Sequence, residues 1–256
     1  MLKFQSSVLI ALLVFSSSST ALADGWDYNA SFGARSLPIG ASFFGDGGYG
    51  ITAWGEKTKD QFIFGYVRPN LRVATSALVD NGDLGVDLYP ISFLGVRLGS
   101  SLATRNVTLD TLDCSLVACG GTLGRNSIET KLTLGAAGYF MQATAVYENQ
   151  TPSIKSVPYA DEVASLAGRT GGDQLLKNEL IVGREFDGGY VGGLHFSAAR
   201  MIASGANNDE QSLVGGYKKG RWTYLAGAGA YESSTQSRSL SMFALFSWSG
   251  IPKIGF

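Results

Sequence analysis

Cysteine, histidine and surplus positive charge are scarce in this sequence, and each shortage excludes a class of function. Two cysteines and one histidine make no complete zinc site. Lys and Arg number 20 against 21 Asp and Glu, and the basic residues are scattered, which argues against a nucleic-acid partner. The sequence contains no Gly-rich phosphate loop before a helix and no acidic calcium repeat, so we expect neither a cofactor nor a metal.

An apolar run long enough for a transmembrane helix is also missing. The run Val8–Phe15 follows a charged start and precedes a Ser/Thr stretch and Ala21-Leu22-Ala23. It is too short to span ~30 Å of hydrocarbon and is typical of a secretory signal peptide. We therefore predict a signal peptide over 1–23, cleaved after Ala23. The alternative is a buried N-terminal helix, but four consecutive serines lie where that helix would continue.

The mature segment, 24–256, contains no Pro-rich or charged linker, so we expect one domain. It holds all 34 glycines, about twice the usual frequency of roughly 7%. They lie among Tyr, Phe, Val, Thr and Ala in alternating runs, as in curved sheets. One stretch, Tyr159–Ala167, between Pro158 and Gly168, has features of a helix.

Alternation of apolar and polar residues is the main structural signal. In Ile128–Leu134, one face carries Ile128, Leu132 and Leu134, and the other face carries Glu129 and Lys131. Similar patterns recur, and they predict twelve strands, with ten as the alternative. The expected strands are Trp26–Ala34, Pro38–Phe44, Gly48–Lys57, Gln61–Val79, Leu84–Arg105, Arg125–Gly135, Gly138–Glu148, Leu175–Phe186, Gly189–Ala203, Glu210–Lys219, Arg221–Tyr231 and Leu240–Ser249.

The predicted connections alternate between tight and long. Tight joints are expected at Asn81-Gly82, Gly135–Gly138, Gly188-Gly189 and Lys218–Arg221, and long ones at Asn106–Gly124, Asn149–Gln174, Ser204–Asp209 and Glu232–Ser239. With the final aromatic Phe256, this pattern resembles Gram-negative outer-membrane β-barrel proteins, which are porin-like in general architecture. The resemblance implies an all-β, transmembrane, antiparallel up-and-down barrel with short periplasmic turns and long outer loops.

Charged residues at strand positions expected to face the lumen are candidates for the lining of a channel. They are Arg72, Asp87, Arg97, Glu129, Lys131, Glu179, Glu185 and Lys218. Because these residues carry both positive and negative charges, two states of the lumen are possible. The charges form a paired network that plugs the interior, or they line an open, weakly selective pore. Cys114 and Cys119 lie close together in the first long loop of an exported protein, and we expect a disulfide between them.

The single histidine allows one enzymatic alternative. His195-Phe196-Ser197 resembles the His-x-Ser pair of outer-membrane lipid A deacylases and phospholipases. By that resemblance, Ser197 would be the nucleophile, His195 the base, and Glu210 or Asp209 the group that orients the base. Ala198 stands where those enzymes carry Asn, and Leu194 and Phe196 would take the lipid face. The same alternation turns His195 and Ser197 inward.

The sequence thus predicts an integral protein of the bacterial outer membrane, acting as a porin-like passive channel or as a structural protein, and not as an enzyme. Lipid hydrolysis is the alternative. Expected partners are outer-membrane lipids, the outer-membrane assembly machinery and small solutes, and we expect a monomer.

Detergent-solubilised protein should give a β-rich circular dichroism spectrum and should migrate differently on a gel before and after boiling. The reason is that a closed sheet leaves no free edge from which to unfold. A helical or mixed spectrum would contradict the predicted fold.

Overall fold

The computed structural model describes residues 25–37, 39–55, 63–76, 79–106, 113–161 and 163–251. The predicted signal peptide, 1–23, and the aromatic Phe256 lie outside the described residues. Among the described residues, no helix has the length and apolar character needed to cross a membrane.

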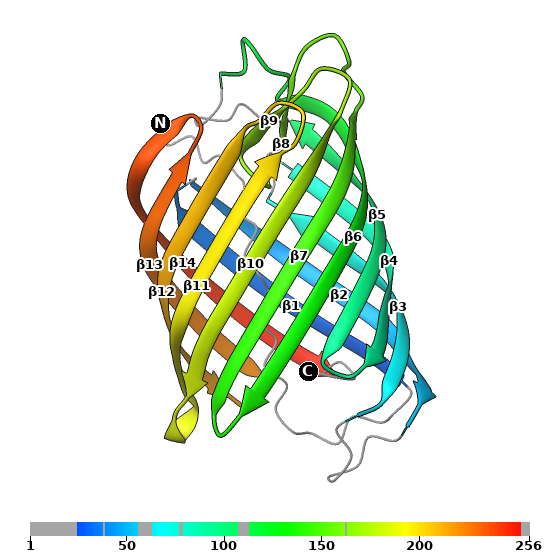
Figure 1. The fold of residues 1–256 in the computed structure, drawn as a ribbon, viewed down its shortest axis with the longest axis vertical. Helices are drawn as coiled ribbons and strands as arrows, with labels where there is room; N and C mark the ends of the chain where they lie inside the picture. The colour runs from blue at the N-terminus through cyan, green and yellow to red at the C-terminus, as the bar shows by residue number, and fades with distance from the viewer. Residues whose placement is uncertain are drawn as a thin grey trace.

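The described chain forms one closed antiparallel barrel of twelve strands (Figure 1), as predicted. The strands are β1 (Gly25–Ser36), β2 (Ile39–Trp54), β3 (Gly65–Thr75), β4 (Val79–Ile91), β5 (Leu94–Asn106), β6 (Gly120–Ala136), β7 (Tyr139–Pro152), β10 (Asp173–Glu185), β11 (Tyr190–Met201), β12 (Asn207–Lys219), β13 (Trp222–Ser233) and β14 (Gln236–Ile251). Each strand pairs with its neighbour in the chain, and β1 pairs with β14 to close the sheet.

The predicted number of strands is confirmed, but two predicted interruptions are wrong. Residues 45–47 and the pair Asn81-Gly82 lie inside β2 and β4. Asn-Gly favours a hairpin turn only where both residues adopt positive φ, and neither does here. Conversely, the predicted strand Leu84–Arg105 contains a turn at Ser92-Phe93, which separates β4 from β5. No glycine or asparagine marks that turn in the sequence.

The two ends of the barrel differ. At the end where β1 begins and β14 stops, here called the turn end, the connections include the tight joints 92–93, 137–138, 186–189 and 220–221. The four predicted long connections all fall at the opposite end, here called the loop end, but the one predicted over Glu232–Ser239 is wrong in length, because β13 and β14 leave only the two-residue turn 234–235. The connection 55–64, at the turn end, is longer than expected. The short 3-10 turn η1 (Asp187–Gly189) lies in the joint 186–189.

The outer face is apolar along most of the barrel. Side chains alternate in exposure along each strand, as in β12, where Leu213 is 68% exposed and Val214 is buried. Aromatic side chains gather on this face near the turn end, where Tyr28 contacts Trp248 with ring centroids 5.7 Å apart. Trp222 and Trp248 are 6.2 Å apart. An apolar band with an aromatic girdle is the surface that a membrane-spanning barrel presents to lipid.

The segment predicted as a helix, Tyr159–Ala167, is instead a small antiparallel hairpin, β8 (Tyr159–Asp161) and β9 (Leu166–Gly168). It lies at the loop end, at the top of Figure 1. The helix prediction is wrong because contacts with the barrel decide the conformation: Tyr159, Ala160 and Asp161 are fully buried. Isolated short helices are marginal, so such contacts outweigh local preference.

Trypsin added to intact cells should cleave after Lys155 and Arg169, which are exposed in the loop-end connection 153–172. Lys219 and Arg221, exposed at the turn end, should be protected because outer-membrane barrels place their short turns in the periplasm. Peptide mass mapping identifies the bonds that trypsin has cleaved. Cleavage after Lys219 or Arg221 alone would show that the orientation is inverted.

Candidate functional site

Four of the predicted lumen residues, Arg72, Asp87, Arg97 and Glu129, belong to one cluster of ion pairs on the inner face of β1–β6. We call it the charge network. Its members are Asp27, Arg68, Asp46, Arg72, Asp83, Asp87, Arg97 and Glu129. Antiparallel register places Asp46 beside Arg72, Arg68 beside Asp87, and Arg97 beside Glu129.

Arg68 is the centre of the charge network. It is 1% exposed and pairs with three carboxylates: Nε donates to Asp27 Oδ2 at 2.7 Å, Nη1 donates to Asp87 Oδ2 at 2.9 Å, and Nη2 contacts Asp46. The sequence prediction missed Arg68 because the neighbouring Pro69 weakened the strand assignment. Its spacing of four residues from Arg72 places both side chains on one face of β3, and this signal could have revealed it.

Arg72 links three strands. Its Nε donates to Asp46 Oδ2 at 3.1 Å, Nη1 donates to Glu129 Oε2 at 3.3 Å, and Nη2 lies 3.7 Å from Asp87 Oδ1. Its side chain is 34% exposed and that of Glu129 is 23% exposed, against 1% for Arg68. Arg72 and Glu129 are therefore the parts of the network most open to the lumen.

The other four predicted lumen residues lie on β6, β10 and β12. Glu179 on β10 pairs with Lys177 at 2.8 Å. Lys131 lies on β6 two residues beyond Glu129. Glu185 and Lys218 lie near the turn end of β10 and β12.

Large inward side chains lie along the wall of the barrel over inward glycines of adjacent strands. A Cβ added at Gly85 would fall 2.3 Å from Nη1 of Arg97, and one added at Gly48 would fall 2.6 Å from the guanidinium of Arg68. The rings of Phe140 and Phe243 lie in the same way over glycines of β10 and β13. Glycine provides this room because it has no side chain. The long side chains thus follow the wall.

An apolar cluster occupies the opposite arc of the wall. Ile181, Val214, Leu225 and Leu245, from β10, β12, β13 and β14, are buried against one another. Phe140 and Phe243 pack on them and remain partly exposed. The sequence prediction did not identify this cluster as part of the lumen.

The residues of the hydrolase alternative do not form a catalytic triad. His195 and Ser197 lie on the inner face, whereas Leu194 and Phe196 are exposed on the outer face. His195 Nε2 is 3.9 Å from Glu179 Oε1, beyond hydrogen-bond distance, and neither ring nitrogen has a hydrogen-bond partner among the described residues. Glu210 accepts a hydrogen bond from Ser212 at 3.1 Å.

The β8–β9 hairpin lies against the inner face at the loop end. Asp161 Oδ1 accepts hydrogen bonds from the amides of Val163 and Ala164, both at 2.9 Å, and Oδ2 accepts one from Gln150 on β7. Leu166 packs with Leu175, Ala199 and Met201, from β10 and β11. The hairpin therefore narrows this end of the barrel.

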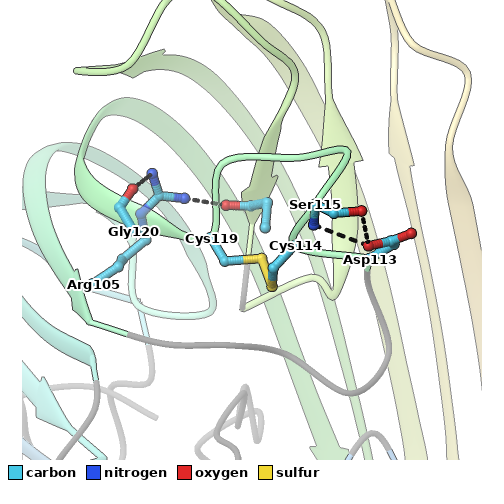
Figure 2. The surroundings of a disulfide bond; sticks show 7 residues. Arg105, Asp113, Cys114, Ser115, Cys119 and Gly120 are labelled. Atoms are coloured by element: carbon cyan, nitrogen blue, oxygen red, sulfur yellow. Dashed lines mark hydrogen bonds between the residues drawn. A yellow bond between two sulfur atoms is a disulfide. The ribbon is translucent and has the colours of Figure 1, made fainter.

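The predicted disulfide between Cys114 and Cys119 is confirmed, and it braces this hairpin (Figure 2). Cys119 is buried against Ala160. The amide of Ala118 donates to Pro158 O at 2.7 Å, and the amide of Ala160 donates to Ala118 O at 3.1 Å. Arg105 of β5 joins both segments, since it donates to the carbonyls of Gly120 and Ala160.

At the exposed edge of the same loop, the hydroxyl and the amide of Ser115 both donate to Asp113 and lower the pKa of its carboxyl below the usual value. No group of residues suited to hold a metal ion occurs in the described part of the chain.

No protein-family model matches this chain, and no curated protein sequence matches it. A solved outer-membrane channel from Pseudomonas putida F1 is similar in structure, with a TM-score of 0.51 and 6% identity over 92% of this chain and 99% of that one. The KdgM porin in complex with disordered oligogalacturonate gives a TM-score of 0.42 and 8% identity over 87% and 98% of the two chains. The translocator domain of the autotransporter NalP from Neisseria meningitidis gives 0.41 and 11% over 90% and 89%.

The likeness to the Pseudomonas channel shows a shared fold. Together with the apolar outer face, this fold is that of an integral outer-membrane β-barrel.

Replacing Gly227 with Val should destabilise the barrel by roughly 1–3 kcal/mol, because the added atoms overpack the wall. A Cβ there would fall 2.4 Å from the ring of Phe243 and 2.8 Å from the carbonyl oxygen of Leu213. The matched control is Gly215→Val on β12, where a Cβ meets nothing within 4 Å. The temperature at which the folded gel band disappears measures both, and an equal shift for the two variants would contradict the close packing at Gly227.

Proposed function

We propose that the protein is a porin-like passive channel for small solutes. The main support is the inner face, where charged side chains pair with one another along the wall over glycines. Barrels with eight strands are filled by side chains and those with sixteen or more hold wide channels, so twelve strands suit a narrow lumen. Ions and hydrated solutes cross such a lumen when polar groups line it.

The β8–β9 hairpin sets the width of this channel at the loop end. Contacts from β5, β7, β10 and β11 hold it against the inner face. It narrows the passage without a moving part, since Arg105 and Gln150 of the barrel bind it through hydrogen bonds.

The remaining assignments follow from this role. Residues 1–23 act as a signal peptide that is removed on export. The mature barrel is inserted by the outer-membrane assembly machinery, contacts lipid through its apolar outer face and works as a monomer. Lipid hydrolysis has no support in the geometry, because His195 and Ser197 face away from lipid.

Purified protein in a planar bilayer should conduct ions. A variant in which a short Gly/Ser linker replaces residues 156–170 should have a severalfold higher conductance, because the narrowest part of the channel is removed. The linker variant must still give the folded gel band.

The matched variants for the alternative function are Ser197→Ala and His195→Ala, which should leave conductance within twofold of the wild type and should reveal no fatty-acid release from lipid A or phospholipid. A wild type that releases fatty acid, and loses this activity in either variant, would establish the hydrolase instead. A folded wild type without conductance would overturn the channel.

A further inference from the structure

The lumen has two chemically different walls at the same depth. The charge network occupies β1–β6, and the apolar cluster occupies β7, β10 and β12–β14. Counted from the turn end, the partly exposed Glu129 is the eighth residue of β6 and the partly exposed Phe243 is the ninth residue of β14, and these strands lie on opposite sides of the ring of twelve. A solute at this depth therefore meets charge on one side and hydrocarbon on the other.

The charged wall carries more negative than positive charge. Five carboxylates, those of Asp27, Asp46, Asp83, Asp87 and Glu129, face the three guanidinium groups of Arg68, Arg72 and Arg97. The balance remains negative when Lys131, on the same face of β6, is included. In a narrow lumen such a surplus attracts cations and repels anions.

Hydrogen-bond acceptors on this wall also lack donors. Asn29 Oδ1, Asn70 Oδ1 and Asp87 Oδ1 are buried and accept no hydrogen bond from the described residues. Arg72 and Arg97 remain 3.7 and 3.8 Å from Asp87 Oδ1. The unpaired donor in the same network is Nη1 of Arg97. Buried acceptors without donors are costly, and their negative partial charge adds to the surplus of negative charge on this wall.

The apolar wall presents aromatic rings to the lumen. Phe140 and Phe243 are partly exposed above the buried aliphatic side chains, and the ring of His195 lies 6.4 Å from that of Phe243. Aromatic faces attract organic cations and bury the apolar groups attached to them. A channel for fully hydrated ions has no need of this surface.

From these features we infer that the lumen binds amphiphilic organic cations, molecules in which an ammonium group is attached to an apolar or aromatic body. The ammonium lies toward Glu129, and the apolar body lies on Phe243. This inference rests on the proposed channel function for the route of entry, but binding itself is measurable without conduction.

The test compares three probes: phenylethylammonium, ethylammonium and phenylacetate. Each is titrated into the detergent-solubilised full-length protein by calorimetry, and each is added to a planar bilayer to block the potassium current. Phenylethylammonium should bind at least about tenfold more tightly than either of the others, because only it matches both walls. Equal binding of phenylacetate would overturn the charge assignment, and equal binding of ethylammonium would overturn the role of the apolar wall.

Variants locate the site. Phe243→Ser should weaken phenylethylammonium binding by about tenfold, and Phe243→Leu, which keeps the apolar volume, should weaken it less. Glu129→Gln should also weaken it. The matched controls are Phe44→Ser, on the inner face of β2 outside the apolar cluster, and Glu232→Gln, exposed at the loop end, and both should bind as the wild type does. Site variants that fold and bind like these controls would overturn the location.

The two proposals fail in different ways. Selective binding without any current would end the channel proposal and leave the site in place. Current with no preference among the three probes would leave the channel and end the inference.

Discussion

Closure of the sheet by hydrogen bonds between β1 and β14 is the constraint on which the rest of the structure depends. In hydrocarbon, an unpaired backbone N–H or C=O costs several kcal/mol, so a sheet can cross a membrane only if it has no edge. Closure then fixes the side-chain pattern, because residues alternate between lipid and lumen along every strand. Leu213 and Val214, neighbours on β12, lie on opposite faces for this reason.

Inside the barrel, the same scarcity of water makes polar groups depend on one another. Arg68 is almost fully buried, and it is tolerable there because three carboxylates surround it. Removing Arg68 would leave the negative charge of these carboxylates uncompensated in a poorly solvated place. The glycines opposite the arginines matter equally, since they let the guanidinium groups lie along the wall. Charge pairing and the glycines of the wall together hold these large side chains in place.

The loop end is held by a second set of contacts, largely independent of the charge network. Asp161 joins the hairpin to Gln150, and the disulfide loop supports Ala160 from the other side. This arrangement holds the hairpin at the loop end by contacts other than those of the charge network. On the two proposals above, different residues therefore set the width of the channel and its chemical preference.

Alternation, the absence of a helical span and the glycine-rich strands were enough to determine a barrel, and Cys114 and Cys119 to determine the disulfide, because these features depend on residues close in sequence. The predicted number of twelve strands is correct because the false break at 45–47 offset the turn missed at 92–93. The sequence Asn81-Gly82 is typical of a turn, yet strand pairing keeps both residues extended within β4. The hairpin Tyr159–Gly168 is bound by side chains of β5 and β7. Arg68, at the centre of the charge network, joins β3 to β1 and β4. Which charges meet, and which wall is apolar, was decided by the register around the closed sheet, which no local pattern encodes.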